Sequence, residues 1–328
     1  MENRIRIHCF GDSVTEGMAM DGHHIAEYGK HSYPSHLLTM LTDQGYAVEV
    51  KNYGHGGEMV ADIAARCGAF ACYTSEEIVI PADNEWVSLG QRHWENGKAV
   101  GTKLRLASGE TPEEDACVYF TQMSHDTNPV FIDGIEYEMK VEKPLNFIRR
   151  KNPDGKETVI PRGALLFTGN HRAGDVHIVY AGINDHGGLT LKRFLRSMQG
   201  CMAVNGGRCI ILGATHALWE KWNDVPGETP DDKYEVYRRA CMQAFGVHFI
   251  DLYDEFSRHG VDIALAQGCF ADLSEEQLTQ MRQKLAQHIL PAEFVYDKQS
   301  EGNVHLSSEG YRVVASLVQE RMKRLGYI

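Results

Sequence analysis

The sequence lacks long hydrophobic runs, and none of its apolar stretches approaches the roughly twenty residues that a membrane-spanning helix needs. It also lacks an excess of basic residues, because 33 Lys and Arg stand against 45 Asp and Glu, for a formal net charge of -12. Nucleic-acid binding depends on clustered Lys and Arg that neutralise phosphates. We therefore expect neither a nucleic-acid partner nor a membrane partner.

Cysteine pairing motifs are also missing. The chain of 328 residues has eight cysteines but no Cys-X-X-Cys pair, and it shows none of the Cys/His spacings typical of zinc sites. Scattered cysteines within apolar runs predict small buried thiols in a reducing compartment, and no metal site. Because no signal peptide precedes the first hydrophobic run, we expect a cytoplasmic protein, although a secreted form with a longer natural N-terminus has the same pattern.

What the sequence does contain is an alternation of strand-like and helix-like segments in residues 1–77 and 169–328. The near-continuous apolar run at 176–182 is typical of a strand buried on both faces, and 57–73 has a helical period. Residues 247–256 are predicted as a further strand, and Ser274 opens a capping box before the next helix. Strands that alternate with helices predict a doubly wound parallel sheet.

Residues 78–168 have a different character. Helical periodicity disappears, and short β-rich pieces are separated by turn signals such as Asp133-Gly134. Residues 145–160 are predicted to form a hairpin. This pattern indicates an antiparallel β module inserted into the α/β domain. Its aromatic residues fit either the core of the module or a carbohydrate-binding surface: Trp86, Trp94 and Tyr119.

Small and polar residues follow the predicted strands, where the active sites of open α/β sheets form. Five segments share this character: GDSVTEG (11–17), NYGHGGE (52–58), GIND (182–185), GATH (213–216) and, before the last helix, NVHLSSEGY (303–311). One such loop would mean little, because Gly and Asp are common in turns. Together they indicate a constellation of functional residues.

Four of these segments resemble the sequence blocks of the SGNH/GDSL hydrolase superfamily. The resemblance covers about residues 4–75 and 174–325. It implies Ser13 as the nucleophile and His305 as the general base. The oxyanion hole would consist of the backbone N–H groups of Ser13 and Gly57 and the side-chain amide of Asn184. The implied fold is flavodoxin-like, a three-layer α/β/α arrangement around a parallel sheet.

The implied activity is that of a serine esterase without metal or organic cofactor, acting on a small-molecule ester. A Ser–His pair suits this chemistry, because imidazole takes the proton of the attacking hydroxyl and returns it to the leaving alcohol. We expect a small acyl ester, most simply an acetyl ester of a carbohydrate. Two alternatives are a lipid or thioester acylhydrolase, and a glycan-binding protein whose scaffold has lost catalytic power.

The sequence departs from the family pattern at the acid. The family usually carries Asp three residues before the catalytic His, and that position is Gly302. Glu301 is one candidate to orient His305, Asp297 is another, and a Ser–His dyad oriented by a backbone carbonyl is the third.

Other residues at strand ends fit either substrate contact or local packing. We expect Asp12 and Asp185 to fix their loops through backbone hydrogen bonds. The candidates for substrate contact are His55, His186, His216, Trp219 and Trp222.

Overall fold

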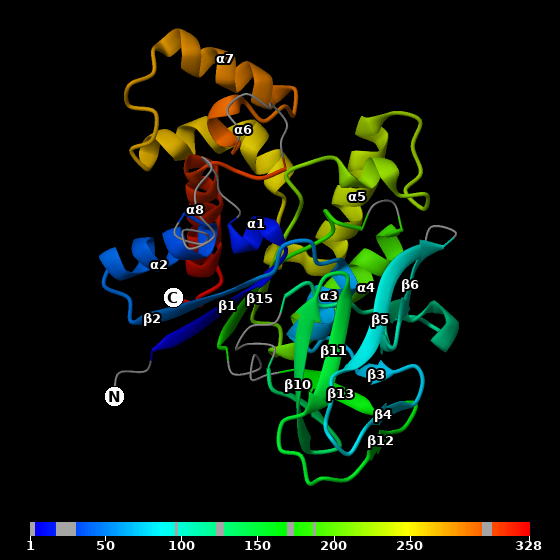
Figure 1. Ribbon diagram of the computed structural model, residues 1–328. Coiled ribbons are helices and arrows are strands. Elements are labelled where there is room, and N and C mark those ends of the chain that lie inside the picture. Colours follow the sequence, from blue (N-terminus) through cyan, green and yellow to red (C-terminus); the bar gives the residue numbers. More distant parts are fainter. Residues whose placement is uncertain are drawn as a thin grey trace.

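The computed structural model describes residues 4–17, 31–95, 98–122, 128–168, 174–185, 188–296 and 304–328. One sheet has five strands, all paired in parallel, in the order β16-β15-β14-β1-β2 (Figure 1). Its strands are β1 (Ile5–Gly11), β2 (Val48–Gly54), β14 (Val176–Tyr180), β15 (Cys209–Leu212) and β16 (Phe249–Ile250). Numbered along the chain, this order is 2-1-3-4-5, which is typical of doubly wound sheets. The predicted mixed α/β class with a parallel sheet is confirmed.

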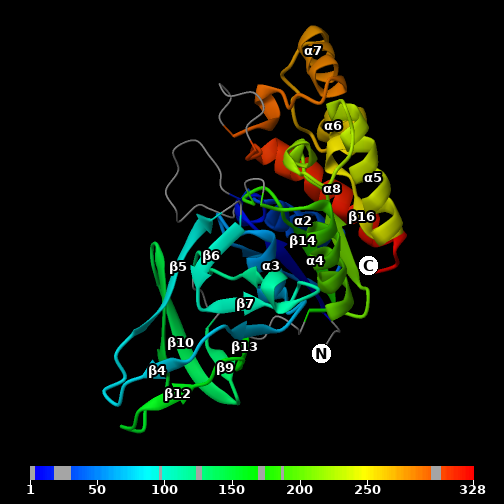
Figure 2. The same ribbon diagram turned by 90° about the vertical axis from the view of Figure 1, so that its right-hand side faces the viewer.

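Helices pack on both faces of the parallel sheet, because successive side chains of a strand point to opposite faces. On β1, Ile7 and Cys9 belong to one apolar cluster and Phe10 to another. The first cluster includes side chains of α2 (Tyr33–Asp43), α6 (Leu252–Ala266), α7 (Glu275–Ala286) and α8 (Ser308–Arg324). The second includes α3 (Val60–Cys67), α4 (Leu191–Val204) and α5 (Pro230–Phe245), as Figure 2 shows from the side.

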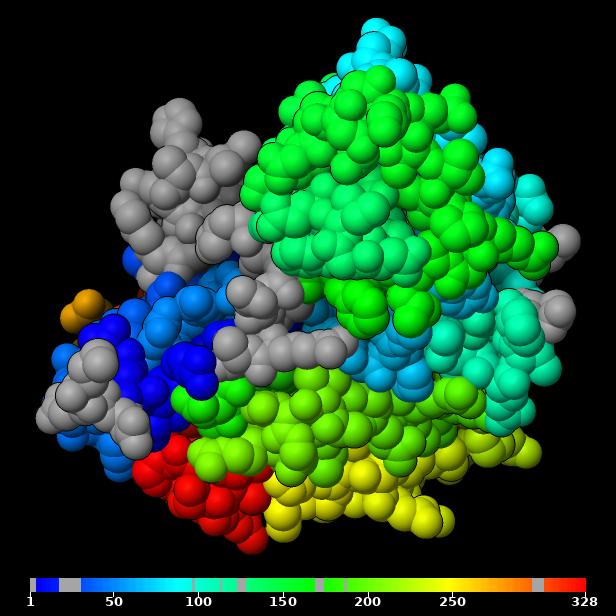
Figure 3. All heavy atoms as spheres, turned by 90° about the horizontal axis from the view of Figure 1, so that it is seen from below, coloured from blue at the N-terminus to red at the C-terminus, as the bar shows by residue number. Residues whose placement is uncertain are grey.

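A second sheet has nine strands in the order β6-β5-β11-β10-β9-β13-β3-β7-β8, all paired antiparallel. Its strands are β3 (Cys72–Thr74), β5 (Val87–Glu95), β6 (Lys98–Thr102), β7 (Leu104–Leu106), β8 (Ala116–Cys117), β9 (Val130–Ile132), β10 (Ile135–Glu142), β11 (Leu145–Arg150) and β13 (Leu165–Thr168). Strands β4 (Ile78–Ile80) and β12 (Thr158–Ile160) pair separately. The strands form a lobe beside the parallel sheet (Figure 2), and its residues gather in one cyan-to-green mass in the space-filling view of Figure 3. Buried residues of the lobe such as Leu104 belong to the same apolar cluster as α3, α4 and α5.

Two local predictions for the turns and caps are confirmed. Asp133 and Gly134 have φ of 50° and 78° and join β9 to β10, which matches the left-handed backbone of a tight hairpin turn. Ser274 caps α7, and Gln277 completes the capping box by accepting the backbone N–H of Ser274.

Three predicted elements differ from the structure. The strand predicted at 247–256 stops at Ile250, because Asp251 caps α6, whose apolar residues Leu252 and Phe256 have helical spacing. The helix predicted over 57–73 ends at Cys67, since Gly68 adopts φ of 77°, and β3 then joins the nine-stranded sheet. The predicted hairpin over 145–160 does not form, because β11 pairs with β10 and β5 while β12 pairs with β4.

All eight cysteines lie within the described ranges, where they are buried and form no disulfide. No helix in the described part of the chain combines the length and apolar character needed to cross a membrane. Among the same residues, no group of three His, Cys, Asp or Glu side chains is placed to hold a metal ion.

Candidate active site

Ser13 and His305 meet at the carboxyl end of β1. The strand ends at Gly11, and the short helix α1 (Ser13–Glu16) begins directly after it because Asp12 caps the helix by accepting the N–H of Val14 at 2.9 Å. This turn places Ser13 Oγ 2.8 Å from His305 Nε2, although 292 positions separate the two residues in the sequence. The pair has the geometry of a hydroxyl nucleophile and its general base.

Hydrogen bonds to the backbone of His305 and to the side chain of Ser307 fix the segment around His305. Its backbone carbonyl accepts the N–H of Tyr296 at 3.0 Å, and Ser307 caps α8 through the N–H of Gly310 at 3.1 Å. The Ser307 hydroxyl donates to the carbonyl of Glu293 at 2.8 Å. Burial lowers the pKa of the His305 imidazole below its usual 6.5, so the neutral form that accepts a proton is favoured.

The group that orients His305 remains a prediction. Glu301, Gly302 and Asp297, on which that prediction depends, lie outside the described residues.

The loop after β2 brings Gly56 beside Ser13, and Gly57 follows it in the same loop. Gly57 has φ of 81°, a backbone conformation that favours glycine, and a Cβ built on Gly56 would lie 3.6 Å from the Cβ of Ser13. The N–H of Gly56 donates to Glu16 Oε2 at 2.8 Å, and its carbonyl accepts from Thr121 Oγ1 at 2.7 Å. Both polar groups of this glycine are therefore fixed by side chains.

The loop after β14 lies against the same segment. Asn184 Nδ2 donates to the carbonyl of Glu58 at 2.9 Å, and Asp185 Oδ2 accepts the N–H of Val60 at 3.1 Å. Asp185, like Asp12, fixes its loop through a backbone hydrogen bond, as the sequence suggested. Because an amide nitrogen carries two hydrogens, Asn184 retains one donor besides the bond to Glu58.

A buried ion pair joins the loop after β2 to the end of β1. Arg66 on α3 pairs with Glu58 at 2.6 Å, with both side chains fully buried, and it also donates to the carbonyl of Gly11 at 3.1 Å. Burial by itself would raise the pKa of Glu58, but the charge of Arg66 and the adjacent His55 lower it overall. An ionised Glu58 thus links the end of β1 to the loop that carries Gly57.

The nine-stranded sheet and its connections also contribute side chains that sequence reasoning missed. Besides Thr121, Gln122 donates to Glu16 Oε1 at 2.8 Å, and Arg92 on β5 pairs with the buried carboxylate of Asp62 on α3. No local signal marks these residues, because they lie outside the segments that resemble known blocks and act only through the tertiary fold.

Three of the residues proposed for substrate contact are buried among other side chains. Trp219 is fully buried and stacks on Tyr237 with ring centroids 4.7 Å apart, and Trp222 is only 3% exposed. Both belong to the core around α5, which is the local packing that the sequence left open as the alternative. His55 is buried and lies 3.3 Å from Glu58 Oε1, which makes it part of the support under the loop.

Of the two remaining candidates for substrate contact, one lies within the described residues and the other does not. His216 is partly buried, and its Nδ1 lies 2.8 Å from Thr215 Oγ1. His186 lies outside the described residues.

Comparison with known proteins finds no matching family model and no matching curated protein. Among solved structures, the chain is similar to the lipase/acylhydrolase from Enterococcus faecalis, with 12% identity, a TM-score of 0.42, and coverage of 97% of this chain and 95% of that one. It is also similar to AlinE4, an SGNH-hydrolase family esterase, with 13% identity, a TM-score of 0.35, and coverage of 88% and 97%. A likeness this weak carries no argument about chemistry, which therefore rests on the residues of the chain itself.

Proposed function

We propose that the protein is a serine esterase of the SGNH/GDSL type. The observation that carries this proposal is the 2.8 Å contact between Ser13 Oγ and His305 Nε2, at the end of a parallel strand where the Gly57 and Asn184 loops converge. We assign the fold to the flavodoxin-like three-layer α/β/α arrangement, with residues 78–168 as an inserted antiparallel module.

The reaction begins when His305 accepts the proton of Ser13 and Oγ attacks the ester carbonyl. The tetrahedral intermediate collapses, and His305 returns the proton to the departing alcohol. A water molecule, deprotonated by the same imidazole, then attacks the acyl-enzyme. The second tetrahedral intermediate then collapses, releases the acid and restores Ser13.

The negative charge of each tetrahedral intermediate needs donors. The N–H groups of Ser13 and Gly57 and the second amide hydrogen of Asn184 would supply them. Loss of one such donor costs about 3–4 kcal/mol of transition-state stabilisation in comparable sites. The bond from Asn184 to the Glu58 carbonyl holds the amide in place before substrate arrives, which lowers the cost of reorganisation.

We further propose an acetyl ester of a carbohydrate or similar polar alcohol as the substrate. The support is chemical: the cavity next to Asn184 is lined by several charged and polar side chains, including Lys98, Arg193 and Ser197. Such a wall suits a polar alcohol better than a long acyl chain.

Hydrolysis of 4-nitrophenyl acetate tests the proposal. We expect turnover by the wild-type protein and its loss in Ser13→Ala and His305→Ala. Ser316→Ala on α8, whose hydroxyl accepts a hydrogen bond from Gln267 Nε2 at 3.4 Å, is the matched control and should retain full activity. Turnover that survives in Ser13→Ala, or is absent from the wild type, would contradict the esterase. In a series from acetate to decanoate, rates that stay level or rise with chain length would favour a lipid acylhydrolase instead.

A further inference from the structure

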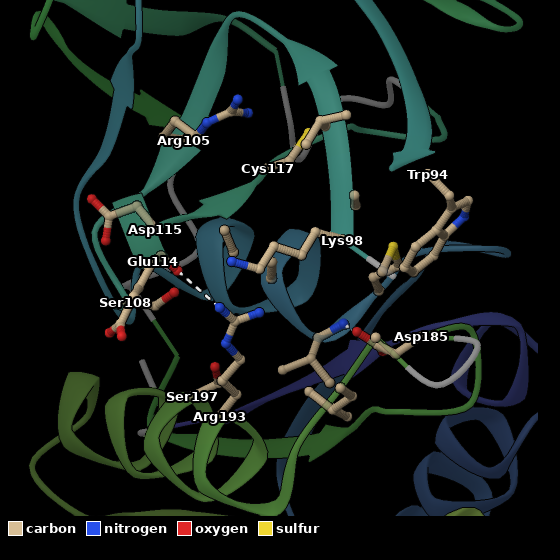
Figure 4. Close-up of a pocket in the computed structure, with 18 of the residues that line it drawn as sticks. Trp94, Lys98, Arg105, Ser108, Glu114, Asp115, Cys117, Asp185, Arg193 and Ser197 are labelled. Carbon is tan, nitrogen blue, oxygen red and sulfur yellow. Dashed lines mark hydrogen bonds between the residues drawn. The ribbon is translucent and has the colours of Figure 1, made fainter. Parts of the chain in front are cut away.

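A cavity of about 270 Å³ lies between the helices α3 and α4 and the nine-stranded sheet (Figure 4). It shares a wall with the candidate active site. Met59 in its lining directly follows Glu58, and Asp185 directly follows Asn184, while Glu58 and Asn184 are hydrogen-bonded to each other. The cavity therefore borders the two segments that carry the predicted oxyanion donors.

Three cations line the cavity without an ion-pair partner in the described part of the chain: Lys98, Arg105 and Arg193. Arg193 donates to the backbone carbonyl of Glu114 at 3.4 Å, and Arg105 donates to the carbonyls of Thr102 and Leu104. Lys98 forms neither a hydrogen bond nor an ion pair with any described residue. Because carbonyl oxygens carry no net charge, these hydrogen bonds do not pair the cations with an anion.

The carboxylates in the cavity wall accept hydrogen bonds from neutral donors. Asp115 accepts the hydroxyl of Tyr73 at 2.7 Å and the N–H of Gly109 at 2.9 Å. Glu114 accepts the N–H of Glu110 at 3.0 Å, and Asp185 accepts that of Val60. None of them pairs with the three cations.

Figure 4 shows the Lys98 side chain extended across the cavity, with its ammonium on the side of the Arg193 guanidinium. Two cations that share a cavity repel each other, and an anion between them removes that repulsion and accepts hydrogen bonds from both. The rest of the wall combines the serines Ser108 and Ser197 with an apolar side that includes Val60, Leu189 and Trp94. This combination fits an organic anion whose carbon skeleton packs on the apolar side.

We propose that this cavity binds a carboxylate on the alcohol part of the ester, so that the preferred substrate is an acetylated acidic sugar or a related hydroxy acid. The inference rests on the proposed esterase function and adds its substrate class. A planar carboxylate offers two acceptor oxygens, one for the Lys98 ammonium and one for the Arg193 guanidinium.

Steady-state kinetics test the proposal with two matched substrates, a monoacetylated methyl glucuronoside and a monoacetylated methyl glucoside. We expect kcat/KM to favour the acidic ester, and we expect Lys98→Met to reduce that preference by about tenfold or more, since a charge-assisted hydrogen bond is lost. Lys192→Met is the control, because this lysine lies next to Arg193 but is paired with Glu110 outside the cavity lining. Equal kcat/KM for the two esters, or the same effect in both lysine variants, would overturn the proposal.

Calorimetric titration of the Ser13→Ala protein with free glucuronate, glucose and glucose 6-phosphate separates the cavity from the chemistry. We expect glucuronate to bind more tightly than glucose, and its binding to weaken in Ser13→Ala/Lys98→Met. If glucuronate binds but the wild type hydrolyses no ester, the esterase fails while the anion site stands. If 4-nitrophenyl acetate is hydrolysed but glucuronate binds no better than glucose, the anion site fails alone. Tighter binding of glucose 6-phosphate would overturn the choice of a carboxylate.

Discussion

Replacing Thr121 with valine tests whether the antiparallel lobe helps to build the oxyanion site. The carbonyl of Gly56 and the N–H of Gly57 belong to one peptide unit, which is planar, so they point in opposite directions. Thr121 Oγ1 donates to that carbonyl at 2.7 Å. The hydroxyl therefore sets the direction of the N–H that we assign to the oxyanion hole.

The expected fall in kcat follows from what the valine side chain keeps and what it removes. Valine replaces the hydroxyl of a side chain that is only 7% exposed with a methyl group of similar size, so the main change is the loss of the hydrogen bond. The Gly56 carbonyl loses its only side-chain donor among the described residues, which costs about 1–3 kcal/mol. If the peptide turns to find another donor, the Gly57 N–H leaves the site, with a loss of up to about 4 kcal/mol. Because about 1.4 kcal/mol corresponds to a tenfold change in rate, we expect kcat to fall by about 10- to 100-fold.

Steady-state hydrolysis of 4-nitrophenyl acetate by wild type, Thr121→Val and Thr121→Ser supplies the kcat and KM values for this comparison. An oxyanion donor acts mainly in the transition state, so kcat should fall in the valine variant while KM changes little. The serine variant keeps the hydroxyl and should retain most of the activity. Thermal unfolding of all three proteins separates a positioning effect from a loss of fold. A valine variant with wild-type kcat, or a serine variant as slow as valine, would refute the reasoning.

Three further predictions concern charge. Since burial lowers the pKa of His305 below 6.5, kcat/KM should be level at neutral pH and decline only on the acid side of 6.5; a midpoint above 6.5 in the pH profile would contradict a buried base. Arg66→Met leaves the Glu58 carboxylate buried without its partner, and urea unfolding should show a loss of about 3–5 kcal/mol, partly recovered by adding Glu58→Gln. Burial raises the pKa of Asp12 from 3.8 to about 8, so the folded protein keeps a proton that the unfolded chain loses, and stability should fall as pH rises from 5 to 8. Asp12→Asn should flatten that fall, and an equal slope in both proteins would mean that Asp12 is ionised in the fold.

The sequence predicted the parallel sheet and the loops at its carboxyl edge because their signals are local. A buried strand is a short apolar run, and a strand end with a functional side chain is marked by Gly and Asp within a few positions, as around Ser13 and Asn184. Such signals need no knowledge of distant contacts. The same is true of the turn at Asp133-Gly134, where backbone preference alone determines the conformation.

The misassigned parts depend on contacts that are distant in sequence. Strand β3 pairs with β7 and β13, and neither partner can be identified from its own three or four residues. Trp219 and Trp222 occupy a loop at the predicted active face, yet α5 folds back over them and Tyr237 stacks on Trp219. Whether a loop tryptophan is exposed or covered is determined by that later helix.

The two donors assigned to the oxyanion hole depend on different parts of the chain, which makes their perturbations separable. The direction of the Gly57 N–H is set by Thr121, which belongs to the antiparallel lobe. The Asn184 amide instead donates to the backbone carbonyl of Glu58, and the Glu58 side chain is paired with Arg66. A change at Thr121 should therefore leave the Asn184 amide in place, and one at Arg66 should disturb both loops together. In the proposed esterase, the lobe formed by the nine-stranded sheet therefore contributes to the oxyanion site, since one of its connections fixes the peptide whose N–H would donate to the developing charge.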